Sequence, residues 1–246
     1  MNNKLWIIAK KDISEAFRSR STYVVIVIMI ILTFSYIVGY TEYVKGLNTQ
    51  QAINKYSHTF LNSLAYVLPM MFSIFVCSVF ANYAVIVDKA KRNIESLMAT
   101  PVSIKQIWLG KTLAVTLPSL GVGITVAILS LLIMDIGFIM PKTGSFVIPD
   151  AVAIVSTLLI IPVLIFIIVS IVTYIQLVIT NPRIGNFVFS GFFFLLLFGS
   201  NIPSALGLPF SYFALIYLGF IVICGGISYF LSRLLTKERV LLSSKV

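Results

Sequence analysis

The sequence predicts an all-α membrane protein with six transmembrane helices and no sizeable soluble domain. Of its 246 residues, 59% are hydrophobic and only 11% are charged, whereas a soluble domain carries about 25% charged residues. The charged residues also sit in a few short clusters, and the stretches between them are long enough for the roughly 20 apolar residues that cross a bilayer. The surplus apolar surface is therefore expected to face lipid.

The positions of the spans follow from the stretches that lack Lys, Arg, Asp and Glu. The longest of these stretches, 184–232, is too long for one helix and is interrupted by SNIPSALGLPFS at 200–211, where prolines and glycines break helices. We therefore divide it into two spans. The predicted single membrane domain, 1–246, has spans at about 22–40, 61–86, 110–134, 152–180, 186–200 and 211–233.

Basic residues predict the orientation of these spans, because Lys and Arg concentrate in cytoplasmic segments. With the N-terminus in the cytoplasm, the basic N-terminus, the loop around 88–111 and the basic C-terminus all lie on the cytoplasmic side. Only Lys45, Lys55 and Lys142 then lie on the other side. We expect a multi-pass protein of the plasma membrane with both termini cytoplasmic. Its basic residues flank spans, so membrane lipid is the expected partner and nucleic acid is not.

Residues 1–20 are too charged to cross a membrane, and their pattern predicts a helix that lies in the interface. Apolar side chains fall on one helical face, and charged or small polar ones fall largely on the other. This amphipathic pattern is typical of interfacial helices. Trp6, Ile13 and Phe17 are the residues that we expect to contact lipid.

The passage ESLMATPVSIKQIWLGKT between the second and third spans carries strong signals for helix ends. Pro101 ends one helix, because the residue before a proline is disfavoured in helical geometry. Ser103 and Gln106 have the spacing of a capping box for the next helix, and Val102 and Ile107 have that of a hydrophobic staple. The sequence thus predicts a short amphipathic helix, a rigid corner and a newly capped helix.

Two interpretations of this corner remain open: it holds a shape that a partner contacts, or it only fixes the angle between two spans. We expect Trp108 to anchor the returning helix at the membrane interface. The residues Gly110-Lys111 do not complete a phosphate-binding loop, because Lys105 stands where that motif needs its first glycine. No nucleotide site is therefore expected on this chain.

The string from Glu95 to Ser103, followed by Gly110-Lys111, resembles the cytoplasmic motif of ATP-binding cassette (ABC) type-2 transporter permeases. The resemblance implies the ABC type-2 exporter fold, in which this chain would be the membrane half of an exporter and not itself an enzyme. It implies pairing as a homodimer or with a similar permease, and docking of separate ABC ATPase subunits. ATP and Mg would be bound by those partner subunits, and no cofactor by this chain.

The resemblance also implies roles for individual residues. The segment 91–105 corresponds to the cytoplasmic coupling helix and its corner, and the N-terminal helix corresponds to the connecting helix. In the family the segment after the fifth span commonly dips back into the membrane, and SNIPSALGLPFS is short for that role. The implied ATPase-coupling residues are Arg92, Glu95, Leu97, Met98, Thr100, Pro101, Val102 and Ser103.

The predicted spans are poor in groups that could carry chemistry or ions. No charged residue lies in the middle of a predicted span, so we expect a hydrophobic or amphipathic solute; an ion-driven transporter or channel subunit that needs no ATPase is the alternative. With one histidine and two cysteines in the chain, a metal site or an intramembrane enzyme is not expected. Candidate pathway residues are Ser78, Asn82, Gln176 and Asn186.

Overall fold

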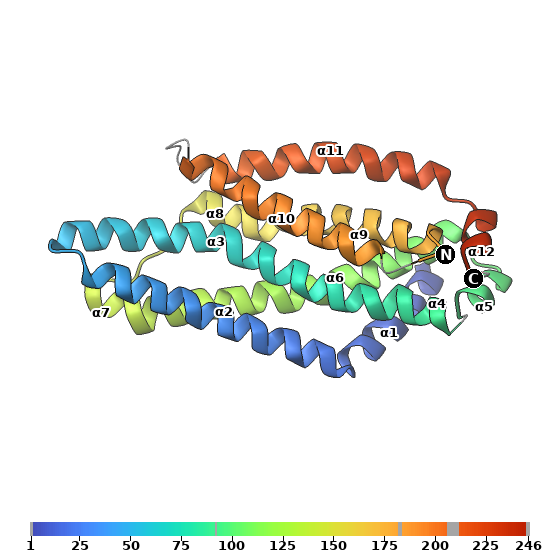
Figure 1. Cartoon of the computed structure of the whole chain (residues 1–246), viewed down its shortest axis with the longest axis horizontal. Coiled ribbons are helices and arrows are strands. Elements are labelled where there is room, and N and C mark those ends of the chain that lie inside the picture. Colours follow the sequence, from blue (N-terminus) through green and yellow to red (C-terminus); the bar gives the residue numbers. More distant parts are fainter. Residues whose placement is uncertain (1, 92, 182–183, 206–211, 245–246) are drawn as a thin grey trace.

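In the computed structural model of the chain, residues 2–91, 93–181, 184–205 and 212–244 are described, and every regular element among them is a helix (Figure 1). Short π-helical segments, η1 (Asn82–Val87), η2 (Asp135–Ile139) and η3 (Ser156–Ile160), join α-helices end to end. The α-helices are α1 (Asn2–Phe17), α2 (Arg20–Lys45), α3 (Gln50–Ala81), α4 (Asp88–Ala90), α5 (Asn93–Ala99), α6 (Ile104–Met134), α7 (Met140–Thr143), α8 (Ala151–Val155), α9 (Ile161–Val178), α10 (Ile184–Ala205), α11 (Tyr212–Leu234) and α12 (Lys237–Ser244).

Five helices among the described residues are long and apolar enough to cross a membrane, which is typical of a multi-pass membrane protein. The all-α class is therefore confirmed, and each of the five helices contains one predicted span or matches it to within two residues at each end. The remaining predicted span, 186–200, falls within α10, which is not one of the five, so a sixth span stays a prediction. The five helices are Arg20–Lys45, Gln50–Val87, Ile104–Thr143, Ala151–Val178 and Tyr212–Leu234.

Helix α3 forms the centre of the bundle, in which the long helices run side by side along the long axis (Figure 1). It is buried over most of its length and packs against α2, α6, α9 and α10. In α2 and α11, by contrast, most of the apolar side chains are partly or fully exposed on the surface of the bundle. Those outward faces are the surplus apolar surface that the composition predicts.

Helices α3 and α6 approach closely at Gly123. A Cβ built on this glycine would lie 2.6 Å from the backbone nitrogen of Ser73 and 2.7 Å from its Cα. No side chain fits in that space, so glycine is what lets the two helices touch along their backbones.

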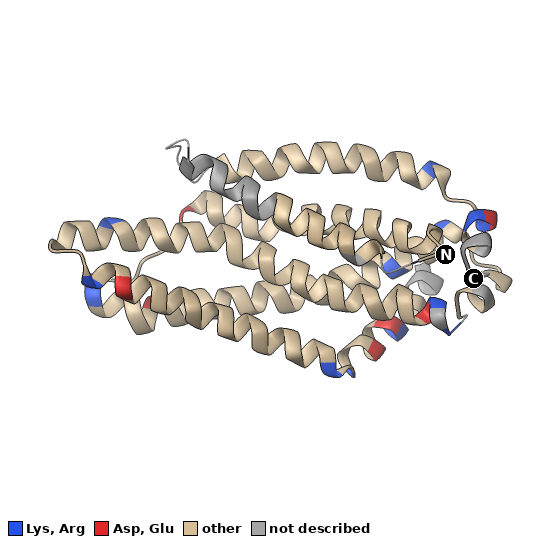
Figure 2. Ribbon diagram, viewed as in Figure 1, with Lys and Arg blue, Asp and Glu red and all other residues tan. Residues whose placement is uncertain are grey.

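Several helices are longer than the predicted spans. Residues 50–60 and 135–143, which the sequence places in outer loops, are helical. The helix Ile104–Thr143 has 40 residues, and at 1.5 Å per residue it is about 60 Å long, twice the roughly 30 Å of a hydrocarbon core. Charged residues gather at the two ends of the bundle, and its middle carries almost none (Figure 2).

Two of the π-helical segments have a local cause in the sequence. A proline in a helix clashes with the carbonyl of the residue four positions earlier. Pro141 follows η2 and Pro162 follows η3, and in each case that earlier residue, Gly137 or Leu158, lies inside the π-helical segment. The wider π turn relieves the clash without ending the helix.

Candidate functional site

The corner between α5 and α6 has the geometry that the sequence predicts. The backbone N–H of Gln106 donates to Ser103 Oγ at 3.2 Å, and the backbone N–H of Ser103 donates to Gln106 Oε1 at 3.0 Å. The predicted capping box is thereby confirmed. On the other side of Pro101, Thr100 Oγ1 donates to the Leu97 carbonyl at 2.5 Å and closes the end of α5. Hydrogen bonds therefore fix both ends of the corner.

One face of α5 is buried against the bundle and the other is available to a partner. Ile94 and Met98 are buried, and α5 packs against α4 and α12. Met98 therefore holds the segment in place in this structure. Ser96 and Ala99 of α5 are exposed, and so are Thr100, Pro101 and Ser103 in the corner that follows α5.

Other predicted coupling residues are less accessible or less well defined. Leu97 and Val102 are half-buried, and both pack against the main core. Glu95 lies in α5, but its side chain lies outside the described residues. Arg92 lies wholly outside them. The residues that a partner can reach are therefore gathered at the corner itself.

A buried ammonium group joins this corner to three other segments. Lys111, seven residues into α6, has a fully buried side chain. Its Nζ donates to Asp88 Oδ2 at 2.7 Å, to Asp12 Oδ2 at 3.1 Å and to the carbonyl of Ala84. These three bonds use all three donors of the ammonium. Lys111 thus ties α1, η1 and α4 to α6 at one point, which we call the Lys111 node.

The two carboxylates of the Lys111 node have different electrostatic environments. Burial raises the pKa of Asp12, because the attraction of Lys111 does not offset the lost hydration and the nearby Asp88 repels it. Burial also acts to raise the pKa of Asp88. Lys111, a hydrogen bond from Asn93 Nδ2 at 2.9 Å and the charge of Lys11 at 3.7 Å outweigh burial and lower that pKa overall. Asp88 is therefore the carboxylate held ionised most firmly.

Lys89, next to the Lys111 node, caps the end of α9. Its Nζ donates to the carbonyls of Gln176, Leu177 and Ile179 at 3.3, 3.2 and 2.7 Å. Carbonyls at a helix C-terminus lack partners within the helix and attract a cation. Burial lowers the pKa of Lys89 to about 8. Through this contact, α9 is attached to the same end of the bundle as the corner.

Helix α1 packs along α6, and the predicted lipid-contacting residues differ in exposure. The Trp6 side chain is 55% exposed, Ile13 is half-buried, and Phe17 is 39% exposed with its ring edge-on to Phe80 at 5.2 Å. Trp108, expected at the interface, is buried instead, and its Nε1 donates to the Ser170 carbonyl at 2.9 Å. The interfacial expectation for Trp108 is wrong, because its polar group is satisfied inside the bundle.

Two of the candidate pathway residues line one cavity. A cavity of about 350 Å³ lies between α3 and α10, and its lining includes Ser78 and Asn82 together with aromatic side chains of α10. Gln176 does not line it. Its side chain is fully buried and packs on Gly185, where a Cβ would lie 2.3 Å from its Cγ. Asn186 lies in α10, with its side chain outside the described residues.

Sequence reasoning missed the Lys111 node because its members belong to distant segments. Lys111 was counted with the basic residues of the loop around 88–111 and Asp12 lies in the predicted interfacial helix, yet both are buried in the bundle. One signal was present: Asp12 shares the face of α1 that carries Ile8 and Ala16, and an acid on the packed side of a helix needs a buried cation.

No protein-family model matches the chain, and no curated protein or solved structure is significantly similar to it. A function for this chain must therefore be argued from its own residues and geometry.

Proposed function

We propose that this chain is the membrane-spanning permease subunit of an ATP-driven exporter of the ABC type-2 kind. In this proposal the chain has six spans, lies in the plasma membrane with both termini in the cytoplasm, and pairs with a second copy or a similar permease. Separate ABC ATPase subunits bind ATP and Mg. The observation that carries the proposal is the capped corner at 100–103, which continues without a break into the long helix Ile104–Thr143.

The corner has the mechanical properties that coupling to an ATPase requires. Its buried face is held by Ile94 and Met98, and its outward side presents Thr100, Pro101 and Ser103. A push on the exposed side is then carried into α6, because the capping box leaves no flexible residue between the corner and the helix. A displacement at one end of a rigid helix becomes a tilt along its whole length.

The Lys111 node extends this motion to neighbouring helices. Lys111 lies about two helical turns after Ile104, and it bonds groups of α1, η1 and α4. Because η1 continues α3, a movement of α6 at Lys111 acts on α3 directly. The proposed cycle therefore moves α1, α3 and α6 as one unit and changes the space between that unit and α10.

The transported solute is proposed to be hydrophobic or amphipathic. The cavity between α3 and α10, which contains Ser78 and Asn82, is lined largely by apolar and aromatic side chains. A space of about 350 Å³ has the size of a small-ligand pocket. It lies between a helix of the moving unit and one outside it, so its volume would change during the cycle.

Breaking the corner should uncouple transport without unfolding the bundle. We expect Pro101→Gly and Glu95→Arg to reduce both solute export and the stimulation of the partner ATPase, while insertion into the membrane persists. Glu42→Arg is the matched control, because Glu42 is an exposed acid of α2 that pairs with Lys45 at 2.6 Å. If both corner variants export normally, the coupling role is refuted.

The ion-driven transporter or channel subunit remains the second candidate, and the Lys111 node is the observation that favours it. Buried ionisable groups near membrane spans often mark ion or proton pathways. This candidate predicts transport by the purified chain in vesicles without any ATPase. Transport that appears only with an ATPase and ATP would exclude it.

A further inference from the structure

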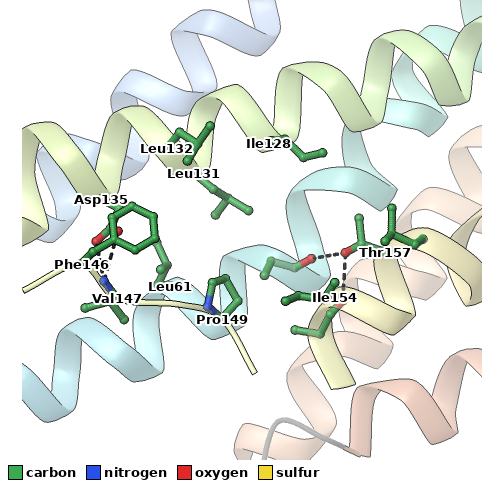
Figure 3. Close-up of a pocket in the computed structure, with 13 residues that line it drawn as sticks. Leu61, Ile128, Leu131, Leu132, Asp135, Phe146, Val147, Pro149, Ile154 and Thr157 are labelled. Carbon is green, nitrogen blue, oxygen red and sulfur yellow. Dashed lines mark hydrogen bonds between the residues drawn. The ribbon is translucent and has the colours of Figure 1, made fainter. Parts of the chain in front are cut away.

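A second cavity, of about 290 Å³, lies toward the end of the bundle opposite to the two termini (Figures 1 and 3). Its walls come from α3, from the end of α6 with η2, from the segment 146–149 and from α8 with η3. The residues that line it are largely apolar, with Asp135 and Thr157 as exceptions. Thr157 Oγ1 is within hydrogen-bond distance of the carbonyls of Ala65 and Ala153, at 3.1 and 3.0 Å, so Asp135 is the polar group that distinguishes the site.

The cavity opens sideways between two helices and not only along the bundle axis. Leu61, Ala65 and Ala153 at its floor are buried, whereas Ile128 and Leu158 at its rim are 44% and 56% exposed. The rim residues belong to helices that are apolar enough to span a membrane. Their exposed faces belong to the lipid, so a ligand with an apolar body can enter from the bilayer.

Asp135 is a buried carboxylate with no cation beside it among the described residues. Its side chain is 1% exposed, and both oxygens accept from the backbone N–H of Val147, at 3.1 and 3.3 Å. Among the described side chains, no Lys, Arg or His nitrogen lies within 4.0 Å of it. Figure 3 shows Asp135 at one end of the cavity beside Phe146 and Val147. A carboxylate withdrawn from water is costly unless a positive charge compensates it, so Asp135 indicates a function.

The cavity is shaped by both of the proline-associated π-helical segments. Asp135 is the first residue of η2, and Thr157 and Leu158 lie in η3. These segments face one another across the same space. Each of these segments accommodates a proline, and π-helical segments within α-helices are also frequent at functional sites. Two of them at one cavity mark it as a built site.

We propose that this cavity binds a cationic amphiphile, with its ammonium group on the Asp135 carboxylate and its alkyl chain along the apolar walls. The charge supplies the cation that Asp135 lacks, and the lateral opening admits the chain from the bilayer. The volume suits a single small ligand. This binding needs no ATPase, so its test does not depend on whether the chain is the permease of an exporter.

The test uses a dodecylammonium probe that carries a photoreactive diazirine in its chain, with the matching dodecanol probe for comparison. The purified full chain in phosphatidylcholine nanodiscs is labelled over a range of probe concentrations, and labelled peptides are identified by mass spectrometry. We expect saturable labelling of peptides that line the cavity, such as those around 128–135 and 146–158. Asp135→Asn should raise the half-saturating concentration of the ammonium probe by about tenfold and leave that of the alcohol unchanged.

Two further variants separate recognition of charge from a general effect. Asp150→Asn is the matched control, because Asp150 lies at the same end of the bundle but outside the cavity lining. Its carboxylate accepts a hydrogen bond from Asn62 Nδ2 at 2.8 Å and lies 4.0 Å from His58 Nε2. This variant should leave the half-saturating concentrations of both probes unchanged. Ala153→Leu would fill the floor of the cavity and should weaken the binding of both probes. The proposal is overturned if the two probes label the wild type equally or if no labelling is saturable. It is also overturned if Asp135→Asn and Asp150→Asn raise the half-saturating concentration of the ammonium probe equally, or if crosslinks show a second copy of the chain covering the cavity.

Discussion

Replacing Lys111 with methionine should destabilise the whole cytoplasmic end of the bundle. Methionine has a similar length but no charge, so Lys111→Met would leave the buried carboxylates Asp12 and Asp88 facing each other without their common cation. Like charges that share a buried site repel, and Lys11, 3.7 Å from Asp88, is about half exposed and does not replace Lys111. The packing volume changes little, so the effect would come mainly from electrostatics.

The magnitude follows from the burial of the three groups. Lys111, Asp12 and Asp88 are each less than 5% exposed, and removing one member of a buried ion pair costs about 3–5 kcal/mol. For a chain of this length, one kcal/mol shifts Tm by about 2–4 °C. The Lys111→Met variant should therefore melt about 6–20 °C below the wild type.

The two cysteines provide a convenient assay for this prediction. Cys77 and Cys224 are both buried, so a thiol-reactive fluorescent dye reports unfolding of the detergent-solubilised protein. Lys105→Met, which changes an exposed lysine of the same helix, should leave Tm unchanged. Adding Asp12→Asn and Asp88→Asn to Lys111→Met should restore much of the lost Tm, because the three replaced side chains are all neutral and leave no unpaired buried charge. A Tm for Lys111→Met within 2 °C of the wild type, on the same scale, would refute the reasoning.

Two further predictions test the packing and the electrostatics of the fold. Gly123→Ala should lower the free energy of unfolding by about 1–3 kcal/mol, because its Cβ would meet the backbone of Ser73. Gly121→Ala, whose Cβ would have nothing within 4 Å, should leave that free energy unchanged. Equal melting temperatures for the two variants would contradict the close approach of α3 and α6. The pKa of Lys89 is lowered from 10.5 to about 8 by burial, so the unfolded chain binds more protons than the folded one between those pH values, and stability should rise with pH across that window. A series of Tm measurements should show this rise in the wild type and not in Lys89→Met; the same slope in both would contradict the assignment.

The sequence predicted those features that depend on local signals. Apolar stretches located five of the helices, and the spacing of Ser103 and Gln106 predicted the capping box because a cap is defined within one helical turn. Long-range pairing could not be predicted in the same way. The Lys111 node joins residues as far apart as Asp12 and Lys111, and each of them taken alone resembles an ordinary charge that flanks a span.

Helix ends away from the corner were predicted less well, for a physical reason. The charge at Asp135 was taken as the end of a span, yet the helix continues to Thr143, and the Val147 N–H donates to the Asp135 carboxylate from the segment that follows. No element was predicted after the last span at 211–233, yet α12 forms there and packs against α5 and α9 with Val240 fully buried. In both places a tertiary contact overrides the local preference for a loop.

The central claim is that an ATPase acts on the corner at 100–103, and photocrosslinking in intact cells tests it most directly. A photoreactive amino acid is placed at position 100 or 103, with position 146 at the other end of the bundle as the control. The account predicts an adduct from positions 100 and 103, and not from 146, with an ATPase that contains a phosphate-binding loop, and a yield that depends on ATP. Reaction of positions 100 and 103 only with reagents confined to the outside of the cell would contradict it.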